Sequence, residues 1–466
     1  MIDGLKPYLE YYESKQAQLG LVPSTWRLDR LKNWVAINPR VLQEGTDGDF
    51  LFSYLDIGSV GTGFLAKRPE KIRFRSAPSR ARRLLQSGDT IVSTVRTYLK
   101  AVLTYDGSID PAVASTGFAV LKPKEQTVPF FVGYFAQSDR FTNQVMAESI
   151  GITYPAISET NLGNLAVVIP PHDEQTAIVR FLDHANGRIE QAIRAKKMLM
   201  ALLNEQKQTI IHRAVTRGLN PNTAFKPSGL PWLGDIPKHW EVSRSKYVFR
   251  EVDDRSATGK ELRLSMCQKR GLIPSSEIEV KRLVSESAVS AKICEAGDLV
   301  LNRLKAHLGV FALASVRGLV SPDYTILRPA RAMCPRYFEL IYRTPACRVE
   351  LRKRAKGIVQ GFWRLYTDDF YDIRVPVPPV PEQEKIVKQL DSDLATLNTA
   401  LARTEREIGL LREYRTRLVA DVVTGKLDVR VAASHLPAEP EIPPNLIESD
   451  ELTDEAETDE TTETTQ

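Results

Sequence analysis

The sequence predicts an α+β fold in which two similar globular domains, each a curved β-sheet with helices, are separated by two long antiparallel coiled-coil helices and related by internal pseudo-two-fold symmetry. The first observation behind this prediction is a duplication, because motifs from the first half of the 466-residue chain return in order in its second half. The second is a set of short segments in each half with the alternation typical of strands. The third is a pair of long segments that each carry one apolar stripe.

Four landmarks define the duplication. Each has a second copy at a nearly constant spacing, and the pairs are residues 19–26 with 233–240, 88–89 with 297–298, 118–123 with 324–329, and 170–178 with 378–386. The last pair shares the pattern Pro-Pro-x-x-Glu-Gln-x-x-Ile. A unit of about 200 residues that occurs twice favours a protein that does one thing at two places.

The sheets are predicted from alternating polar and apolar residues that end at turn residues. The expected strands are residues 90–95, 101–105 and 117–121 in the first copy and 299–304, 310–314 and 324–327 in the second. One helix is expected after each set, over residues 129–148 and 335–356, and each begins with a Pro that suits the first turn of a helix.

The long segments have the clearest periodicity. Residues 171–217 and 379–426 place apolar side chains at steps of three and four, which is the seam of a coiled coil. Because a globular part precedes each segment, antiparallel pairing would put one globular part at each end of a rod and keep the Gly- and Pro-rich link after residue 217 short. About 45 helical residues make a rod of about 65–70 Å. An amphipathic helix lying on its own domain, the alternative, would end after about 10–20 residues.

These elements predict five segments. They are a first domain at residues 1–170, a long helix at 171–217, a linker and second domain at 218–378, a second long helix at 379–426, and an acidic disordered tail at 427–466. The tail prediction rests on composition, because residues 431–466 hold eleven Asp or Glu and no Lys or Arg. Residues 1–430 carry a net charge of +16, from 63 basic and 47 acidic residues. Such a body favours a polyanionic partner, with a merely soluble basic protein as the alternative.

Cysteine usage and hydropathy predict a cytoplasmic protein. The four cysteines lie in the second copy, and none forms a C-x-x-C pair, which argues against a disulfide framework or a zinc site. We also find no signal-peptide pattern and no apolar run long enough to cross a bilayer.

Familiar catalytic motifs are missing from the sequence. There is no G-x-x-x-x-G-K-[ST], H-E-x-x-H or G-x-S-x-G, and the six histidines are scattered. The glycine-rich residues 58–64 lack the strand–loop–helix context of a phosphate-binding loop, so we expect a turn after a strand, with residues 269–274 as its counterpart. We therefore predict no catalytic residues, no metal and no cofactor.

Several segments together resemble the DNA-specificity subunit of type I restriction–modification systems. They are Gly-Leu-Pro-Trp-Leu-Gly-Asp-Ile-Pro-Lys-His-Trp-Glu at residues 229–241, Lys-Gly-Ile-Val-Gln at 356–360, Val-Pro-Val-Pro-Pro-Val-Pro-Glu-Gln-Glu-Lys-Ile at 375–386, and Val-Thr-Gly-Lys-Leu at 423–427. The first copy has weaker versions at residues 169–175 and 215–219. The match spans about residues 1–430. It departs from the pattern at Arg217-Gly218, where Gly-Lys is expected, and in the acidic tail.

The resemblance implies a function. The two globular parts would be target-recognition domains, each reading one half of a split, asymmetric site in double-stranded DNA, and the helices would set the gap between the halves. The chain itself would be non-catalytic. It would dock two modification subunits, which bind S-adenosylmethionine and methylate adenine, and an ATP-dependent restriction subunit would join them for cleavage.

Candidate DNA contacts come from basic or aromatic residues in turns at matching places of the two copies, and from the basic run at residues 68–83. They are Arg73, Arg75, Arg82, Arg83, Arg96, Tyr98, Lys100, Thr153 and Tyr154 in the first copy, and Lys269, Arg270, Arg303, Lys305, His307, Gln360 and Arg364 in the second. A solvated surface charge is the alternative for each of the charged residues.

Two other repeated features have structural explanations. Trp26 and Trp240 are expected to anchor packing rather than to stack on bases. The Glu-Gln pairs at residues 174–175 and 382–383 open long helices, so helix capping is their expected role, with docking of partner subunits second.

Two functions of other classes remain open at this point. One is a single-chain nucleic-acid enzyme with an unrecognised active site. The other is a coiled-coil scaffold with no DNA role.

Overall fold

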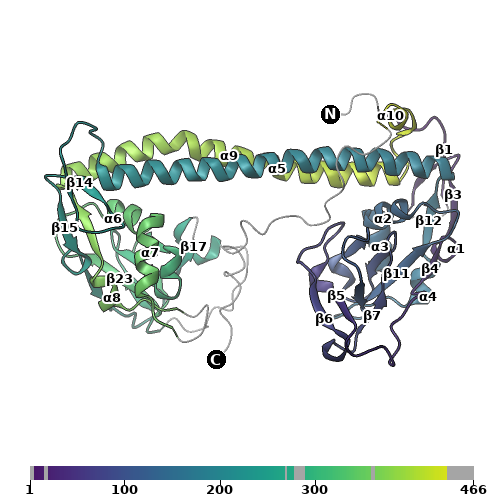
Figure 1. Cartoon of the computed structure of the whole chain (residues 1–466), viewed down its shortest axis with the longest axis horizontal. Coiled ribbons are helices and arrows are strands. Elements are labelled where there is room, and N and C mark those ends of the chain that lie inside the picture. The colour runs from purple at the N-terminus through teal and green to yellow at the C-terminus, as the bar shows by residue number, and fades with distance from the viewer. Residues whose placement is uncertain (1–4, 15–18, 268–269, 278–288, 358–362, 438–466) are drawn as a thin grey trace. The chain divides into compact units, whose positions relative to one another are not determined.

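The computed structural model of the chain describes residues 5–14, 19–267, 270–277, 289–357 and 363–437. Contacts divide the chain into two units (Figure 1). Unit 1 comprises Met1–Lys196 and Glu407–Gln466, and unit 2 comprises Lys197–Arg406. Each unit holds one sheet-rich part and one half of each long helix. The predicted α+β class with two similar domains is confirmed.

Unit 1 is built on a four-stranded sheet in the order β4-β11-β8-β9, in which every neighbour is antiparallel. These strands are Val35–Ile37, Phe118–Pro123, Thr90–Ser93 and Val102–Thr104. Both faces of this sheet are buried, because Ala119 shares a core with helix residues 131–136, whereas Ile91 shares another core with Leu55 and Ala112 of neighbouring strands. A second sheet in the order β6-β5-β10-β7 consists of Glu70–Arg73, Leu51–Leu55, Ala112–Ser115 and Ala81–Leu84.

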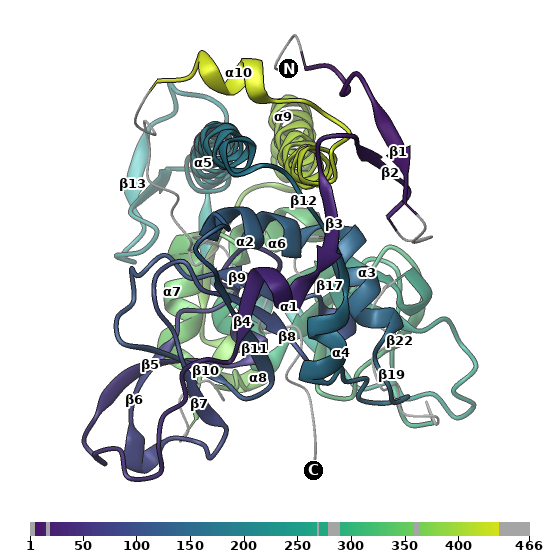
Figure 2. The same ribbon diagram turned by 90° about the vertical axis from the view of Figure 1, so that its right-hand side faces the viewer.

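The remaining elements of unit 1 are short. Two-stranded sheets pair β1 with β2 and β3 with β12, and these strands are Tyr11–Glu13, Leu21–Pro23, Arg27–Arg30 and Ala166–Ile169. The small helices are α1 at Leu31–Trp34, α4 at Glu159–Asn164 and α10 at Arg430–Ser434. In Figure 2, which faces unit 1, α2 (Pro129–Gln137) lies beneath the ends of the long helices, and its residues share one apolar core with them.

Unit 2 repeats the main sheet strand for strand. Its order is β16-β23-β20-β21, and the strands are Phe249–Val252, Tyr324–Pro329, Leu299–Asn302 and Phe311–Leu313. Four further pairs of strands complete the unit. They are β15 (Glu241–Arg244) with β24 (Arg374–Val377), β13 (Phe225–Pro227) with β14 (Asp235–Pro237), β17 (Leu264–Cys267) with β18 (Gly271–Pro274), and β19 (Lys292–Cys294) with β22 (Gly318–Val320). The short helix α8 is Thr367–Tyr371. The shared strand order establishes that the sequence duplication is a duplication of fold.

The single helix predicted after each sheet is wrong, because each is two helices. In unit 1 they are α2 (Pro129–Gln137) and α3 (Asp139–Ala147), and in unit 2 they are α6 (Pro335–Tyr342) and α7 (Pro345–Arg354). Ser138 is extended and its hydroxyl accepts the Phe141 N–H at 3.3 Å, so it caps α3. Thr344 likewise accepts the Cys347 N–H, and Pro345 cannot continue a helix hydrogen-bond ladder.

The long helices are confirmed, as α5 (His172–Arg217, 46 residues) and α9 (Val380–Val423, 44 residues). Within unit 1 the Lys196 Nζ lies 2.6 Å from the Glu407 Oε2, and an Arg415 guanidinium nitrogen lies 3.5 Å from the Glu190 Oε2. As the residue number rises along α5, the number of the partner residue in α9 falls, so the two helices pack antiparallel.

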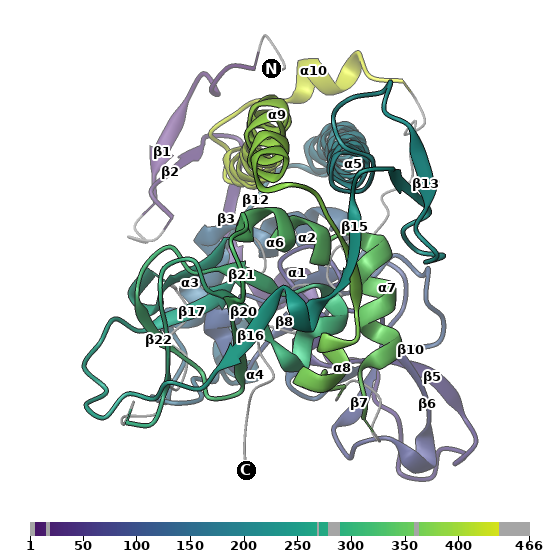
Figure 3. The same cartoon turned by 90° about the vertical axis from the view of Figure 1, so that its left-hand side faces the viewer.

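Unit 2 holds the other halves of the two helices, with the same direction of pairing. The Lys207 Nζ donates to the Asn398 Oδ1 at 2.7 Å, and Ile211 shares a core with Leu390 and Ile386. In Figure 3, which faces unit 2, α6 lies beneath α9, and their residues belong to this core. None of the helices in the described part of the chain has both the length and the apolarity that a membrane span requires.

The two repeated tryptophans are packing anchors, as predicted. Trp26 is 3% exposed and Trp240 is fully buried. Residues 427–437, which we assigned to the start of a disordered tail, instead pack on unit 1, where Val429 and Ala433 are buried. The rest of the predicted tail, residues 438–466, lies outside the described residues.

The Glu-Gln pairs have a role that capping does not describe, because three of their four side chains are buried. Gln175 donates to the Pro170 carbonyl and accepts the Val128 N–H at 2.9 Å. Gln383 does the same with the Pro378 carbonyl and the Cys334 N–H. Each glutamine thus joins the start of a long helix to the residue that precedes α2 or α6.

Candidate nucleic-acid interface

Three loops of unit 1 meet beside the main sheet. They are residues 57–68 after β5, residues 94–101 between β8 and β9, and residues 149–156 between α3 and α4. The Thr62 hydroxyl donates to the Lys100 carbonyl at 2.7 Å, which ties the first loop to the second. The hydroxyls of Thr97 and Ser149 lie 2.9 Å apart and tie the second loop to the third. We call residues 94–101 and 149–156 the unit 1 tip.

The turn in residues 94–101 is strained at both ends of its short 3-10 helix, Thr97–Leu99. Arg96 has a φ of 52° and Lys100 a φ of 48°, in the left-handed region that residues with a Cβ rarely occupy. The Leu99 N–H donates to the Arg96 carbonyl at 2.9 Å and helps to hold this shape. Strained backbone of this kind gathers at binding sites, where the surrounding structure holds it in place.

The loop in residues 149–156 is a closed ring of backbone. Ile150 and Ala156 exchange both of their N–H to carbonyl hydrogen bonds, at 2.9 and 3.0 Å. Gly151 has a φ of 117°, and a Cβ there would lie 3.1 Å from the Tyr154 carbonyl oxygen. The loop projects Tyr154, and the Arg96 guanidinium lies over the Tyr154 ring at 5.1 Å.

The structure therefore brings together the predicted residues Arg96, Tyr98, Lys100, Thr153 and Tyr154. The Tyr98 side chain is 54% exposed and that of Tyr154 is 62% exposed.

The other predicted cations of unit 1 lie on its second sheet or beside α4. Arg73 and Arg75 share the carboxylate of Asp49, at 2.7 and 3.1 Å, which neutralises half of their charge. The Arg82 guanidinium lies over the Phe74 ring at 5.0 Å. Arg83 pairs with Glu159 at 2.9 Å and its side chain is only 17% exposed, so packing within unit 1 accounts for this residue without a DNA contact.

The equivalent turn of unit 2 is the 3-10 segment η6, Arg303–Leu308, which contains Lys305 and His307. The Arg303 Nε donates to the Asp323 carbonyl at 2.7 Å, and an Arg364 guanidinium nitrogen lies 3.5 Å from the Asp323 Oδ1. Two predicted cations thus meet around one acidic residue.

One other predicted residue of unit 2 that the structure describes, Arg270, pairs away from this turn. Arg270 lies in the β17–β18 turn and pairs with Glu277 at 2.6 Å. Lys269 and Gln360 lie outside the described residues.

Sequence reasoning missed several residues at these sites. In unit 1 it missed Ile150 and Ile152, because no periodicity in the sequence indicates that these side chains are exposed. In unit 2 it missed Arg348, which packs against Gly309, and Arg352, whose guanidinium lies over the Trp363 ring at 4.8 Å. Burial and the nearby Arg343 lower the pKa of Arg348. The cationic last turn of α7 was the available signal for Arg352.

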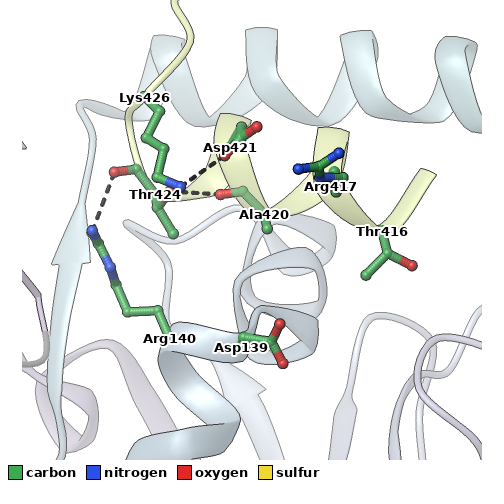
Figure 4. A pocket seen from close by; sticks show the side chains of 8 residues that line it. All are labelled: Asp139, Arg140, Thr416, Arg417, Ala420, Asp421, Thr424 and Lys426. Carbon is green, nitrogen blue, oxygen red and sulfur yellow. Dashed lines mark hydrogen bonds and ion pairs between the residues drawn. The ribbon is translucent and has the colours of Figure 1, made fainter. Parts of the chain in front are cut away.

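A pocket of about 420 Å³ lies in unit 1 between the start of α3 and the end of α9 (Figure 4). An Arg140 guanidinium nitrogen donates to the Thr424 carbonyl at 3.3 Å, and Lys426 pairs with Asp421 at 2.9 Å across the same end of α9. Asp139 lines the pocket and also binds the Lys100 Nζ of the tip at 2.6 Å. These pairs of lining residues with one another and with the tip favour a role in holding α3, α9 and the tip together.

Among the residues that the structure describes, no group of three or more His, Cys, Asp or Glu side chains is placed to hold a metal ion.

Comparison with known proteins finds similarity to one group of proteins. Residues 76–196 match the type I restriction modification DNA specificity domain. The chain is 20% identical over 457 residues to the putative type I restriction enzyme MjaX specificity subunit of Methanocaldococcus jannaschii, and the alignment covers 91% of this chain and 99% of that protein. It is also 20% identical over 332 residues to the EcoKI specificity subunit of Escherichia coli, covering 68% of this chain and 69% of that protein.

A solved structure gives the same result at the level of fold. A chain described in connection with complex assembly and conformational transition of the type I R-M system has a TM-score of 0.60 at 21% identity, covering 86% of this chain and 98% of that chain. The chain thus carries a match to the type I restriction modification DNA specificity domain at residues 76–196, and along most of its length it is similar to type I restriction enzyme specificity subunits.

Proposed function

We propose that this chain recognises a bipartite, asymmetric DNA site, with each unit reading one half, and that it assembles the subunits that act on that DNA. The observation that carries the proposal is a repeat in three dimensions. The same strand order ends in a cation-bearing turn at the same place in both units, after β8 in unit 1 and after β20 in unit 2.

The physical basis is the division of labour in DNA binding. Lys and Arg contacts to phosphates supply affinity that falls with salt, and contacts to base edges supply specificity. Both kinds of group are present at the unit 1 tip, as Arg96 and as Tyr98 and Tyr154. The turn of unit 2 presents Arg303 and Lys305 instead, so two copies of one fold would read two different sequences.

Similarity to specificity subunits supports a DNA-recognition role for this chain rather than a catalytic one. Two modification subunits and an ATP-dependent restriction subunit would supply methyl transfer and cleavage, in the cytoplasm. Docking is supported by apolar side chains that stay exposed on the long helices, Met198 and Leu202 on α5 and Leu410 on α9. Exposed apolar groups on otherwise paired helices are typical of surfaces that bind a further partner.

The test uses the purified full chain and duplex DNA. We expect binding that weakens linearly with the logarithm of salt concentration. We also expect no methyl transfer when S-adenosylmethionine is added. Adenine methylation by this chain alone would favour the single-chain enzyme and overturn the proposal, and no binding to duplex DNA at any salt concentration would favour the scaffold.

A further inference from the structure

The geometry points to the unit 1 tip as a reader of methyl groups in the DNA major groove, so that the half-site of unit 1 contains thymine contacted by Ile152. This inference rests on the proposed function and adds to it the chemical class of base that one unit selects.

The first observation is apolar exposure concentrated on two linked loops. Ile152 is 103% exposed and Ile150 is 78% exposed, on the loop that also presents Tyr154. Leu99 on the adjoining turn is 45% exposed, beside Tyr98. Single exposed aliphatic residues are ordinary, but five large apolar side chains on one small tip form a patch that a partner would bury.

The second observation is that the tip is held in shape before any partner arrives. The backbone ring of residues 150–156, the Thr97–Ser149 hydrogen bond and the left-handed Arg96 and Lys100 fix the positions of the side chains. Binding through such a tip loses little chain entropy, because the loop is already ordered.

The third observation is the charge around the patch. Residues 94–101 and 149–156 contain Arg96 and Lys100 and no Asp or Glu, and since Lys100 pairs with the Asp139 carboxylate at 2.6 Å, Arg96 is the cation that the tip adds to the rim. Lys67 and Arg68 are exposed on the neighbouring loop, which is tied to the tip through Thr62. An apolar centre with a cationic rim suits a polyanion that carries apolar groups better than it suits a neutral protein surface.

DNA has one apolar group of this kind on its base edges. Thymine presents its C5-methyl group in the major groove, and the minor-groove edges of all four bases have none. A branched aliphatic side chain such as that of Ile152 can cover such a methyl group. Burying one methyl is expected to change affinity by about fourfold.

The experiment begins with selection of the duplexes that the full chain binds from a randomised pool. Each thymine of the selected duplex is then replaced, one at a time, by deoxyuridine, which lacks only the methyl group. We expect about fourfold weaker binding at one or more thymines in one half of the site. The Ile152→Ser variant should bind the thymine and deoxyuridine duplexes equally at those positions.

The controls separate the tip from the rest of the surface. Leu9 is as exposed as Ile152, at 101%, but lies outside the tip, so Leu9→Ser should keep the full deoxyuridine effect. The slope of affinity against salt should be the same for Ile152→Ser and the unsubstituted chain, because no charge changes. If Ile152→Ser does not fold, the deoxyuridine series on the unsubstituted chain still tests whether thymine methyl groups contribute to binding.

Several outcomes would overturn the inference. Deoxyuridine tolerated at every position, or a selected site without thymine, would exclude methyl reading. A deoxyuridine effect that persists in Ile152→Ser would assign it to another residue, and an equal loss on every duplex would indicate a wedge between bases. Failure to select any sequence would be a different result, because it would remove the proposed function itself.

Discussion

At the scale of single residues, identical motifs have different surroundings in the two units. The Glu174 carboxylate is buried and accepts hydrogen bonds from the Trp26 indole at 2.8 Å and from the Tyr8 hydroxyl. Burial and that carboxylate raise the pKa of Tyr8, so its hydroxyl stays a donor. The Glu382 carboxylate pairs instead with His239, a half-exposed side chain. One motif thus acts as a buried link in unit 1 and as a surface pair in unit 2.

Removing these two carboxylates should therefore have unequal effects. Glu174→Ala leaves the Tyr8 and Trp26 donors buried without an acceptor, and we expect it to lower the free energy of unfolding by about 2–4 kcal/mol. Glu382→Ala is the matched control and should cost about 1 kcal/mol or less, because exposed ion pairs contribute little. Denaturant titration of both variants measures the difference. Equal losses would contradict the assignment.

A partly buried carboxylate gives a prediction about pH. The Asp183 side chain accepts the Tyr134 hydroxyl at 2.6 Å, and burial raises the pKa of Asp183 above its ordinary value. A raised carboxyl pKa means that the folded state binds the proton more tightly, so this group favours folding at low pH and less so as pH rises through the folded pKa.

Asp183→Asn should remove that contribution while it keeps an acceptor for Tyr134. Relative to the unsubstituted chain, the variant should gain stability as pH rises from about 4 to neutral. Thermal unfolding across this range tests the sign. A difference that is constant with pH, or that falls, would be inconsistent with a raised pKa.

The predicted base and phosphate contacts are also tested at this scale. Arg96→Gln should reduce the slope of log affinity against log salt by about 1, because one phosphate contact is lost. Arg27 is an exposed cation on β3, outside the three loops, and Arg27→Gln is its control. Filter binding or fluorescence anisotropy at several salt concentrations gives both slopes. The same slope for Arg96→Gln and the unsubstituted chain would favour the coiled-coil scaffold.

At the scale of elements, the features that sequence predicts best are patterns that repeat many times or occur in both copies. The stripes of α5 and α9 run for many turns, so noise at single positions does not hide them, and the main-sheet strands recur twice. The break between α2 and α3 was missed because a single Ser138 ends one helix and caps the next without interrupting the apolar pattern. Pro345 was a clearer signal for the α6–α7 break, since proline disfavours helix interiors.

The unit 1 tip shows why the site was only partly predictable. Its cations could be found by comparing the two copies. The exposure of Ile150 and Ile152 could not, because whether an isoleucine is inside or outside a fold depends on contacts that are distant in sequence. The Asp49 carboxylate that neutralises Arg73 and Arg75 is likewise brought to them by the fold.

The shape of this element can be tested through Gly151. Gly151→Ala places a Cβ 3.1 Å from the Tyr154 carbonyl at a left-handed φ, and the strain should be about 1–3 kcal/mol. We expect weaker DNA binding with little change in global unfolding, because the loop lies at the edge of unit 1. Gly45→Ala is the control, since a Cβ there meets nothing within 4 Å. Unaltered DNA affinity in Gly151→Ala would show that the loop shape is not used.

At the scale of the whole molecule, duplication of one fold within one chain is the central feature. The two main sheets have the same strand order, and the equivalent glutamines Gln175 and Gln383 join the start of each long helix to the residue before α2 or α6. The turns that project from them carry different side chains. This combination suits a protein that uses one architecture to read two unrelated short sequences.

The most direct test of this account is an exchange of the first domain. Residues 1–170 would be replaced by the equivalent part of another specificity subunit, and the hybrid would be produced together with its modification subunits. Sequencing of the methylated motif should show a bipartite site in which one half has changed and the other is retained. An unchanged motif, or a change in both halves, would contradict independent reading by the two units.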